Sequence, residues 1–170
     1  MVIVMNFYVD GGCRGNGTSW AIGAAAACTW SSLDQVWIAR TEHLDTWQYR
    51  ATNHRAEVLA VIIALQWSLR RLSRLTPNSD IEINIFSDSS SVVNTMRSWI
   101  HSWFANGWVD SRGGQVAHQD LLRQALVLDH EVSESATINY IQIPRELNRI
   151  ADAACNDALD EQGYYWRNWH

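Results

Sequence analysis

The chain has 170 residues, of which 47% are hydrophobic and 18% are charged, a composition that excludes disordered and fibrous proteins. Its length is typical of one folding unit, so we expect a single domain over residues 1–170. The formal net charge is −5 and all 13 basic residues are arginines. This balance counts against a broad basic surface that grips nucleic acid.

No apolar run approaches the roughly 20 residues that a membrane span needs, and the first residues lack the basic flank of a signal peptide. Cys13, Cys28 and Cys155 lie far apart and form no CxxC pair, so they predict neither a disulfide framework nor a structural zinc site. We therefore expect an intracellular protein, cytoplasmic or nuclear, that is neither secreted nor embedded in a membrane.

The first half of the chain predicts three strands and a long helix. Residues 3–9 are rich in Val, Ile, Phe and Tyr and run into Asp10 and two glycines, which is typical of a strand entering a turn. Residues 19–30 and 35–43 predict two further strands joined by a polar turn. Apolar residues at helical spacing then predict a helix over about 53–75, which the stretch Pro77 to Asp80 breaks.

The second half alternates strands with helices. The pattern predicts a strand over 81–86, a helical stretch from 90 through 103, a glycine-punctuated loop, a helix over 119–128, a strand over 136–143 and a last helix over 148–160. This order predicts the α/β class: a five-stranded mixed sheet, in which a three-strand antiparallel meander joins parallel strands, flanked by helices.

Four carboxylates stand at the ends of predicted elements. Asp10 closes the first strand, Asp88 follows the fourth, and Glu57 and Asp152 lie near the starts of two helices. If the first and fourth strands are parallel neighbours, all four acids can reach one edge of the sheet, where ligands of such sheets bind. Clustered carboxylates repel one another unless a cation intervenes, and Mg²⁺ is the hard divalent ion that suits oxygen ligands.

Each acid also has a local explanation that needs no ligand. Asp10 before a glycine is a common turn residue, Asp88 can cap the helix that follows it, and Glu57 and Asp152 suit a helix N-terminus. Only convergence of the four in space distinguishes a metal site from four separate caps.

Five short motifs, in matching order, resemble the type 1 ribonuclease H family along most of the chain. They are YVDGGCRGNG at 8–17, TNHRAE at 52–57, FSDS at 86–89, WIHSW at 99–103 followed by GW at 107–108, and NRIADAA at 148–154. The resemblance implies a ribonuclease H-like fold with a protruding handle, here about residues 97–115. It also implies hydrolysis of the RNA strand of RNA–DNA hybrids.

The resemblance assigns the catalytic and metal-binding roles to the four acids, Asp10, Glu57, Asp88 and Asp152. They would hold two Mg²⁺ ions, with Mn²⁺ able to substitute, and Asp10 and Asp88 would be the most direct ligands. Such ions activate water and neutralise the charge of the transition state.

Substrate contacts carried over from the family fall on eight residues. The turn containing Cys13, Arg14 and Asn16, together with Asn53, would meet the 2′-hydroxyls of the RNA strand. Arg50 and Thr52 match a pocket for a DNA phosphate, and Trp99 and Trp103, one helical turn apart, would pack along the DNA strand. Trp99 and Trp103 equally suit handle packing, Trp108 is expected to be structural, and His101 is expected to be exposed.

The chain departs from the family in ways that affect turnover and affinity. Residues 143–148 form a short segment without the histidine that many members carry before the last helix, which predicts slower turnover. Phe104 to Gly107 of the handle carry no positive charge, where substrate-gripping members are basic. We therefore expect weak hybrid affinity, or dependence on a tethered domain or partner protein.

Two other readings compete with the hybrid nuclease. One is a non-catalytic module of the same fold that binds nucleic acid or protein, and the other is the ribonuclease H domain of a reverse-transcriptase-like polyprotein. The uncharged handle favours the first of these, while the full set of four acids opposes it.

Overall fold

The computed structural model describes residues 1–76 and 80–169, apart from the side chains of Trp166 and Trp169. Its strands are β1 (Val2–Arg14), β2 (Ile22–Ser31), β3 (Val36–His43), β4 (Asp80–Ser87) and β5 (Thr137–Gln142). Its helices are α1 (Asn53–Leu72), α2 (Ser90–Asn94), the π-helical η1 (Thr95–Trp99), α3 (Ile100–Asn106), α4 (Gln119–Ser133), the 3₁₀ turn η2 (Arg145–Leu147) and α5 (Arg149–Trp169).

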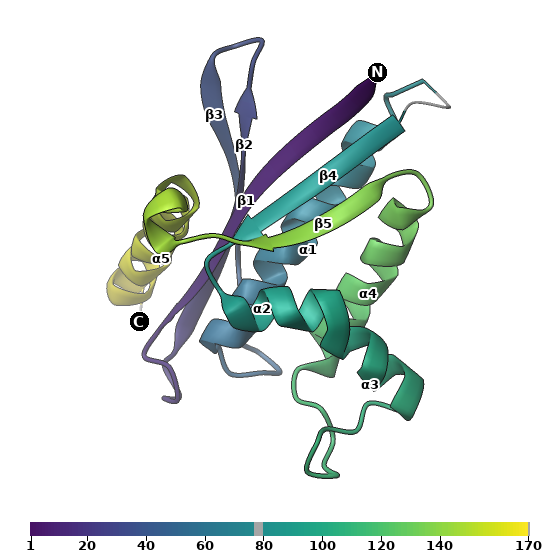
Figure 1. The fold of residues 1–170 in the computed structure, drawn as a ribbon. Coiled ribbons are helices and arrows are strands. Elements are labelled where there is room, and N and C mark those ends of the chain that lie inside the picture. Colours follow the sequence, from purple (N-terminus) through teal and green to yellow (C-terminus); the bar gives the residue numbers. More distant parts are fainter. Residues whose placement is uncertain (77–79, 170) are drawn as a thin grey trace.

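The strands form one sheet in the order β3-β2-β1-β4-β5 (Figure 1). β1 pairs antiparallel with β2, and β2 antiparallel with β3, while β4 is parallel to both β1 and β5. The expected five-stranded mixed sheet of a meander and parallel strands is therefore confirmed.

Helices cover both faces of the sheet. On one face α1 packs on β1, where Phe7 meets Trp67 with ring centroids 5.6 Å apart. On the other face Cys155, Ala158 and Leu159 of α5 pack on β2. The strand β2 contains a run of four alanines at residues 24–27, all fully buried, and their small side chains let a helix approach from each side.

The first strand is longer than the sequence pattern predicts. Pairing with β4 stops at Tyr8, whereas pairing with β2 continues to Arg14. The glycines after Asp10 suggest a turn, but they lie within the strand because both sheet faces are crowded there. A Cβ on Gly11 would lie 2.1 Å from the backbone carbon of Ala56, and one on Gly12 would lie 3.3 Å from Leu159. Asp10 therefore lies inside β1 and does not end it.

Several helix boundaries also differ from the predictions. The stretch from 90 through 106 is helical, but the π turn η1 interrupts it between α2 and α3. The last helix runs to Trp169 instead of residue 160, and Gly163 packs near Ile22 at the start of β2. α1 ends at Leu72 with Ser73 as its C-cap, and Pro77 to Ser79, expected to break it, lie outside the described residues.

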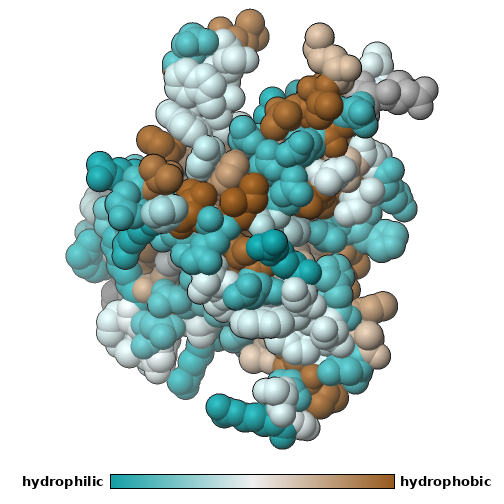
Figure 2. All heavy atoms as spheres, viewed as in Figure 1, coloured by the Kyte–Doolittle hydropathy of each residue, from teal (hydrophilic) through white to brown (hydrophobic). Residues whose placement is uncertain are grey.

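The part of the sheet that neither α1 nor α5 covers is only partly exposed, with Val4 open to solvent and Asn84 buried. Figure 2 shows hydrophobic side chains there in separate patches among hydrophilic ones.

Among the described residues, no helix combines the length and apolar character that crossing a bilayer requires.

Candidate active site

The register of the parallel strands brings Asp10 and Asp88 to the same place. Tyr8 of β1 is the partner of Phe86 of β4, and their rings stack with centroids 4.8 Å apart. The pairing of β1 with β4 ends at this pair, so the residue two positions further on each chain lies just past the same point. Those two residues are Asp10 and Asp88, as the convergence hypothesis requires.

Asn148 fastens the start of α5 to both strands. Its buried side-chain nitrogen Nδ2 donates to the Val9 carbonyl and to Asp88 Oδ1, each at 2.9 Å. The backbone N–H of Asp152 donates to the Asn148 carbonyl, so the first turn of α5 starts from this anchor. Asp152 therefore begins its helix from the same residue that holds Asp88.

Glu57 reaches the site from the opposite face of the sheet. The missing side chain of Gly11 lets α1 lie against β1 at Ala56, the residue before Glu57. Ser89 Oγ donates to Glu57 Oε2 at 2.9 Å and accepts from the Val92 N–H as the N-cap of α2. One hydroxyl therefore joins the ends of β4, α2 and α1.

The four acids influence one another electrostatically. Burial, and then the charges of Asp88, Asp152 and Glu57 in that order of strength, together raise the pKa of Asp10 to about 7, although a backbone hydrogen bond from Gly11 lowers it. Burial also raises the pKa of Glu57, with a smaller contribution from Asp88, while the Ser89 hydrogen bond lowers it. Asp10 is thus the carboxylate that the other three surround.

Two buried thiols border the same acids. Burial, and then the charge of Asp10, raise the pKa of Cys28 to about 11 and that of Cys155 to about 12. Both thiols therefore stay protonated at neutral pH, and they are poor metal ligands, because a thiol binds metal as the thiolate.

The alternative explanation, in which each acid is a separate turn or capping residue, holds only in part. Ser89, not Asp88, caps α2, and the first turn of α1 contains no acidic residue, so Glu57 caps nothing there. Asp152 does lie in the first turn of α5.

The donor set suits a hard cation, although it is not a closed cage. Within the described part of the chain, no three His, Cys, Asp or Glu side chains already stand as a group that could enclose a metal. Individual acids are held by neighbours instead: Asp88 by Asn148, Glu57 by Ser89, and Asp152 by Arg145 at 3.5 Å. The charges of the other three acids oppose ionisation of Asp10, and a divalent cation would relieve that repulsion.

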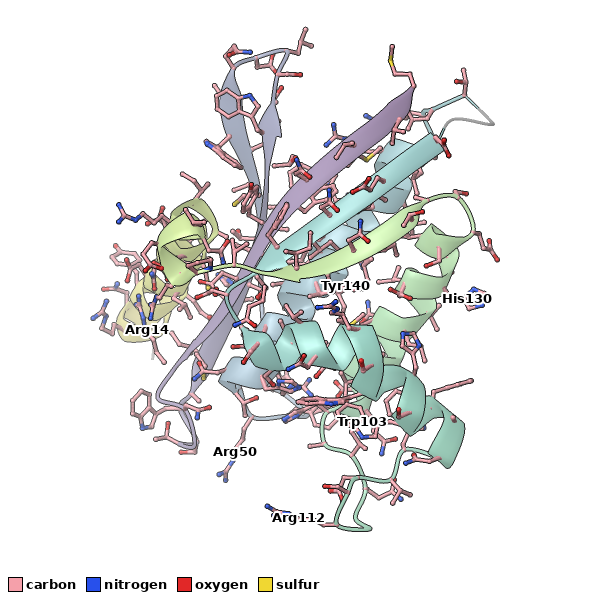
Figure 3. The ribbon with its side chains drawn as sticks, viewed as in Figure 1. Arg14, Arg50, Trp103, Arg112, His130 and Tyr140 are labelled. Carbon is pink, nitrogen blue, oxygen red and sulfur yellow. The ribbon has the colours of Figure 1, made fainter. Side chains whose placement is uncertain are left out.

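The residues predicted to meet the RNA strand are partly brought together. The backbone N–H of Cys13 donates to Asn53 Oδ1 at 3.0 Å, which ties the end of β1 to the start of α1. Asn16 is exposed in the turn that follows. Arg14 instead points to α5 (Figure 3), where it pairs with Asp160 at 2.6 Å.

The predicted phosphate pocket lies before α1. Thr52 caps that helix by accepting from the Arg55 N–H at 3.2 Å, while Arg50 projects away from the body (Figure 3). The rings of His54 and His118 stand 5.7 Å apart beside it. Two imidazoles, whose pKa values burial lowers, therefore lie beside the residues predicted to bind a phosphate.

The handle presents one exposed tryptophan and one half-buried tryptophan. Trp99 is 44% exposed, and its ring centroid lies 6.1 Å from that of Trp103. The predictions for the neighbouring residues are confirmed: Trp108 is buried beneath Arg123, and His101 is exposed.

Sequence reasoning missed three residues that organise the site: Asn148, Ser89 and Arg55. Asn148 and Ser89 stand directly before helices, so their capping preference was a usable signal. Arg55 is only 3% exposed and makes two hydrogen bonds to Asp120, at 2.8 and 2.7 Å, which join the starts of α1 and α4. Nothing in the local pattern marks that pair.

Comparison with known proteins matches this geometry to one family. The family model for RNase H matches residues 3–159. The chain belongs to the ribonuclease H family. A Ribonuclease H of Ruthia magnifica subsp. Calyptogena magnifica is 30% identical over 159 residues, covering 91% of this chain and 94% of that protein. Family membership makes this chain a nuclease.

Solved ribonuclease H structures share the fold. RNase H1 from the halophilic archaeon Halobacterium salinarum superposes with a TM-score of 0.62 at 24% identity, covering 93% of this chain and 98% of that one. LC11-RNase H1, determined in complex with an RNA/DNA hybrid, gives a TM-score of 0.67 at 21% identity, with the same coverage of each chain.

Proposed function

We propose that this ribonuclease H hydrolyses the RNA strand of RNA–DNA hybrids. The observation that carries the proposal is the parallel pairing of β1 with β4, which ends just before Asp10 and Asp88, together with the hydrogen bonds that bring Glu57 and the start of α5 to the same place. Clustered carboxylates cost stability, so their retention in one place favours a metal-dependent enzyme over a binding module of the same fold. The hybrid bound to the LC11 neighbour gives the substrate class.

The metal-binding residues of the proposal are Asp10, Glu57, Asp88 and Asp152, with Asp10 and Asp88 as the most direct ligands. They would hold two Mg²⁺ ions, for which Mn²⁺ can substitute, because carboxylate oxygens are the preferred ligands of both. Bound there, the ions would supply an activated water and neutralise charge at the scissile phosphate.

The protein's own contribution is to position these acids. Asn148 orients Asp88 and Ser89 orients Glu57, each through a hydrogen bond of 2.9 Å. Because both partners stand at helix starts, the carboxylates are held by rigid elements and not by loops.

We assign recognition of the hybrid to two groups of residues beside the acids, one for the RNA strand and one for the DNA strand. The backbone and side chains of Cys13, Asn16 and Asn53 suit the 2′-hydroxyls of RNA, and Arg14 flanks them. Arg50 and Thr52 suit a phosphate of the DNA strand, and Trp99 and Trp103 of the handle, residues 97–115, suit its sugars and bases.

The test compares cleavage of an RNA–DNA hybrid, single-stranded RNA, duplex RNA and duplex DNA with Mg²⁺ or Mn²⁺. We expect cutting of the hybrid's RNA strand only, and a loss of roughly 10³-fold in Asp10→Asn and in Asp88→Asn. Asp157→Asn, an exposed acid on α5, is the matched control and should keep wild-type activity. Equal activity in all four proteins would contradict the proposal.

We also propose an intracellular location, and a tethered domain or partner protein that strengthens hybrid binding. The three cysteines, Cys13, Cys28 and Cys155, are free thiols, which agrees with a reducing compartment. The handle residues Phe104 to Gly107 carry no charge, which is the reason to expect help from elsewhere.

A further inference from the structure

Four of the 13 arginines gather at the end of the molecule away from the acids. Arg70 and Arg71 form the last turn of α1, Arg74 follows two residues after the helix end, and Arg40 comes from β3. We name these four residues the arginine cluster. With a rise of about 1.5 Å per residue, Arg71 lies roughly 20 Å along α1 from Glu57.

The arginine cluster is electrostatically unfavourable within the protein. Among the described residues, none of its members forms an ion pair, although the chain as a whole carries an excess of acids. Burial lowers the pKa of Arg40, and the charges of Arg70 and Arg74 lower it further. The negative end of a helix favours Arg70 and Arg71, but it does not account for Arg40 and Arg74.

The cluster borders a cavity of about 340 Å³ between the β2–β3 hairpin and the end of α1. Guanidinium groups of Arg71 and Arg74 line it on one side, and Ser31 and Ser32 line it on the other. Trp67 forms part of its floor, with the Arg40 guanidinium 4.3 Å above its ring. The nearest acid on the hairpin turn is Asp34, which accepts a hydrogen bond from Ser31.

These groups match a phosphate-bearing ligand. Arginine binds phosphate in a bidentate manner, and the Ser32 hydroxyl can donate to a remaining oxygen. The same hairpin carries two further aromatic groups, Trp30 and Trp37, which are 44% and 40% exposed and lie 5.7 Å apart. Proteins that bind unpaired nucleotides commonly combine positively charged side chains, which contact the backbone, with exposed aromatic rings, on which the bases stack.

We propose that the arginine cluster and its cavity bind the backbone of single-stranded nucleic acid, outside the active site. A single strand suits the cavity because unpaired bases can stack on the exposed Trp30 ring that lines it, while the backbone phosphates meet Arg71 and Arg74. The proposal rests on the proposed function for its biological meaning. The strand bound here is the unpaired extension of a hybrid whose paired part lies at the acids.

This second contact would compensate for the uncharged handle. A hybrid with a single-stranded tail gains phosphate contacts that a blunt hybrid lacks. We therefore expect a tailed hybrid to be cleaved with a lower KM than a blunt hybrid of the same paired length, at an unchanged kcat.

The direct test is binding of a fluorescent single-stranded DNA or RNA oligonucleotide in EDTA, so that no cleavage occurs. For Arg71→Gln/Arg74→Gln we expect roughly tenfold weaker binding and a salt slope shallower by about 1.4, since each single-strand phosphate contact contributes about 0.7. Arg71→Lys/Arg74→Lys keeps the charge and should retain most of the salt slope. Arg149→Gln/Arg167→Gln removes two exposed charges on α5 and should bind single strands like wild type.

Cleavage separates this proposal from the proposed function. Arg71→Gln/Arg74→Gln should cleave a blunt hybrid normally, which also shows that it folds, and should lose the KM advantage of the tailed hybrid. If wild-type protein cleaves no hybrid, the proposed function fails, while the binding result stands by itself. Equal single-strand binding by wild type and Arg71→Gln/Arg74→Gln would overturn the inference. The inference would also be overturned if polyglutamate, at the same concentration of charge, displaced the labelled oligonucleotide as well as an unlabelled single strand does.

Discussion

Asp10 is the residue whose ionisation the fold opposes most. Its carboxylate is partly buried and faces three other acids, and burial and repulsion together raise its pKa to about 7. The ionised carboxylate raises the free energy of the metal-free protein, and a bound cation would lower it again.

Replacing this residue should therefore stabilise the metal-free enzyme. We expect Asp10→Asn to raise the free energy of unfolding at pH 8 in EDTA by roughly 1–3 kcal/mol, because the amide is neutral. Added Mg²⁺ should raise the melting temperature of wild type and leave that of Asp10→Asn nearly unchanged, since only the wild-type folded state gains a ligand. Differential scanning calorimetry measures both effects. An equal Mg²⁺ shift in the two proteins would contradict the assignment of Asp10 to the metal.

At the scale of elements, the site depends on contacts that hold helix starts against strand ends. Asn148 joins β1, β4 and α5, and Ser89 joins α1 to α2. Each is a polar side chain placed where a helix begins, so backbone geometry and catalytic geometry are fixed by the same residue.

Truncating the Asn148 anchor should affect stability and catalysis together. Asn148→Ala leaves the Val9 carbonyl and Asp88 without their donor, and we expect a loss of roughly 2–3 kcal/mol in the free energy of unfolding. Activity of the remaining folded protein should fall mainly in kcat, because Asp88 is no longer oriented. Asn156→Ala, an exposed position on the same helix, should change neither quantity. Wild-type melting of Asn148→Ala would show that the anchor is dispensable.

The clamp between Arg55 of α1 and Asp120 of α4 gives a pH-dependent prediction. The Arg55 hydrogen bonds lower the pKa of Asp120 below the usual value of an aspartate. The stabilisation is therefore present above pH about 4 and is lost as the pH falls through the lowered value.

Asp120→Asn should unfold more easily than wild type at pH 7, by roughly 1–3 kcal/mol, because the buried guanidinium loses its counter-charge. The difference between the two proteins should shrink progressively as the pH falls below about 4, and it should vanish below the lowered pKa, where wild-type Asp120 is also neutral. Urea unfolding of both proteins at several pH values measures this difference in the free energy of unfolding. A difference that stays constant down to pH 2 would mean that the charge of Asp120 contributes nothing.

At the scale of the whole molecule, the distribution of charge matters more than the net charge. The net charge of −5 conceals an acidic site, an uncharged handle loop and the arginine cluster at the far end of α1. A blunt hybrid at the acids meets few arginines, because Arg55 is engaged with Asp120 and Arg14 with Asp160.

Binding of a blunt hybrid should accordingly depend weakly on salt. We expect a plot of log K against log salt concentration to have a slope shallower than about −6, since each phosphate contact contributes about 0.9. Filter binding of Asp10→Asn over a salt series provides the measurement. A slope of about −6 or steeper would show that the protein grips the duplex without a tethered domain or partner.

The sequence by itself determined the fold class, the order of strands and helices, and the set of acids to examine. It could do so because burying one face of an element imposes a local period on its side chains, and because five motifs stand in a recognisable order. It misjudged the first strand at Gly11, since a glycine needed for close helix packing looks the same as one needed for a turn.

Tertiary structure decided what the acids and arginines have as neighbours. Asp10 and Asp88 meet through the parallel register of β1 and β4, and Asn148 reaches Val9 across 139 positions of the chain. The arginine cluster likewise joins β3 to the end of α1. Such contacts depend on strand pairing and helix packing between distant segments, and no local pattern of residues encodes them.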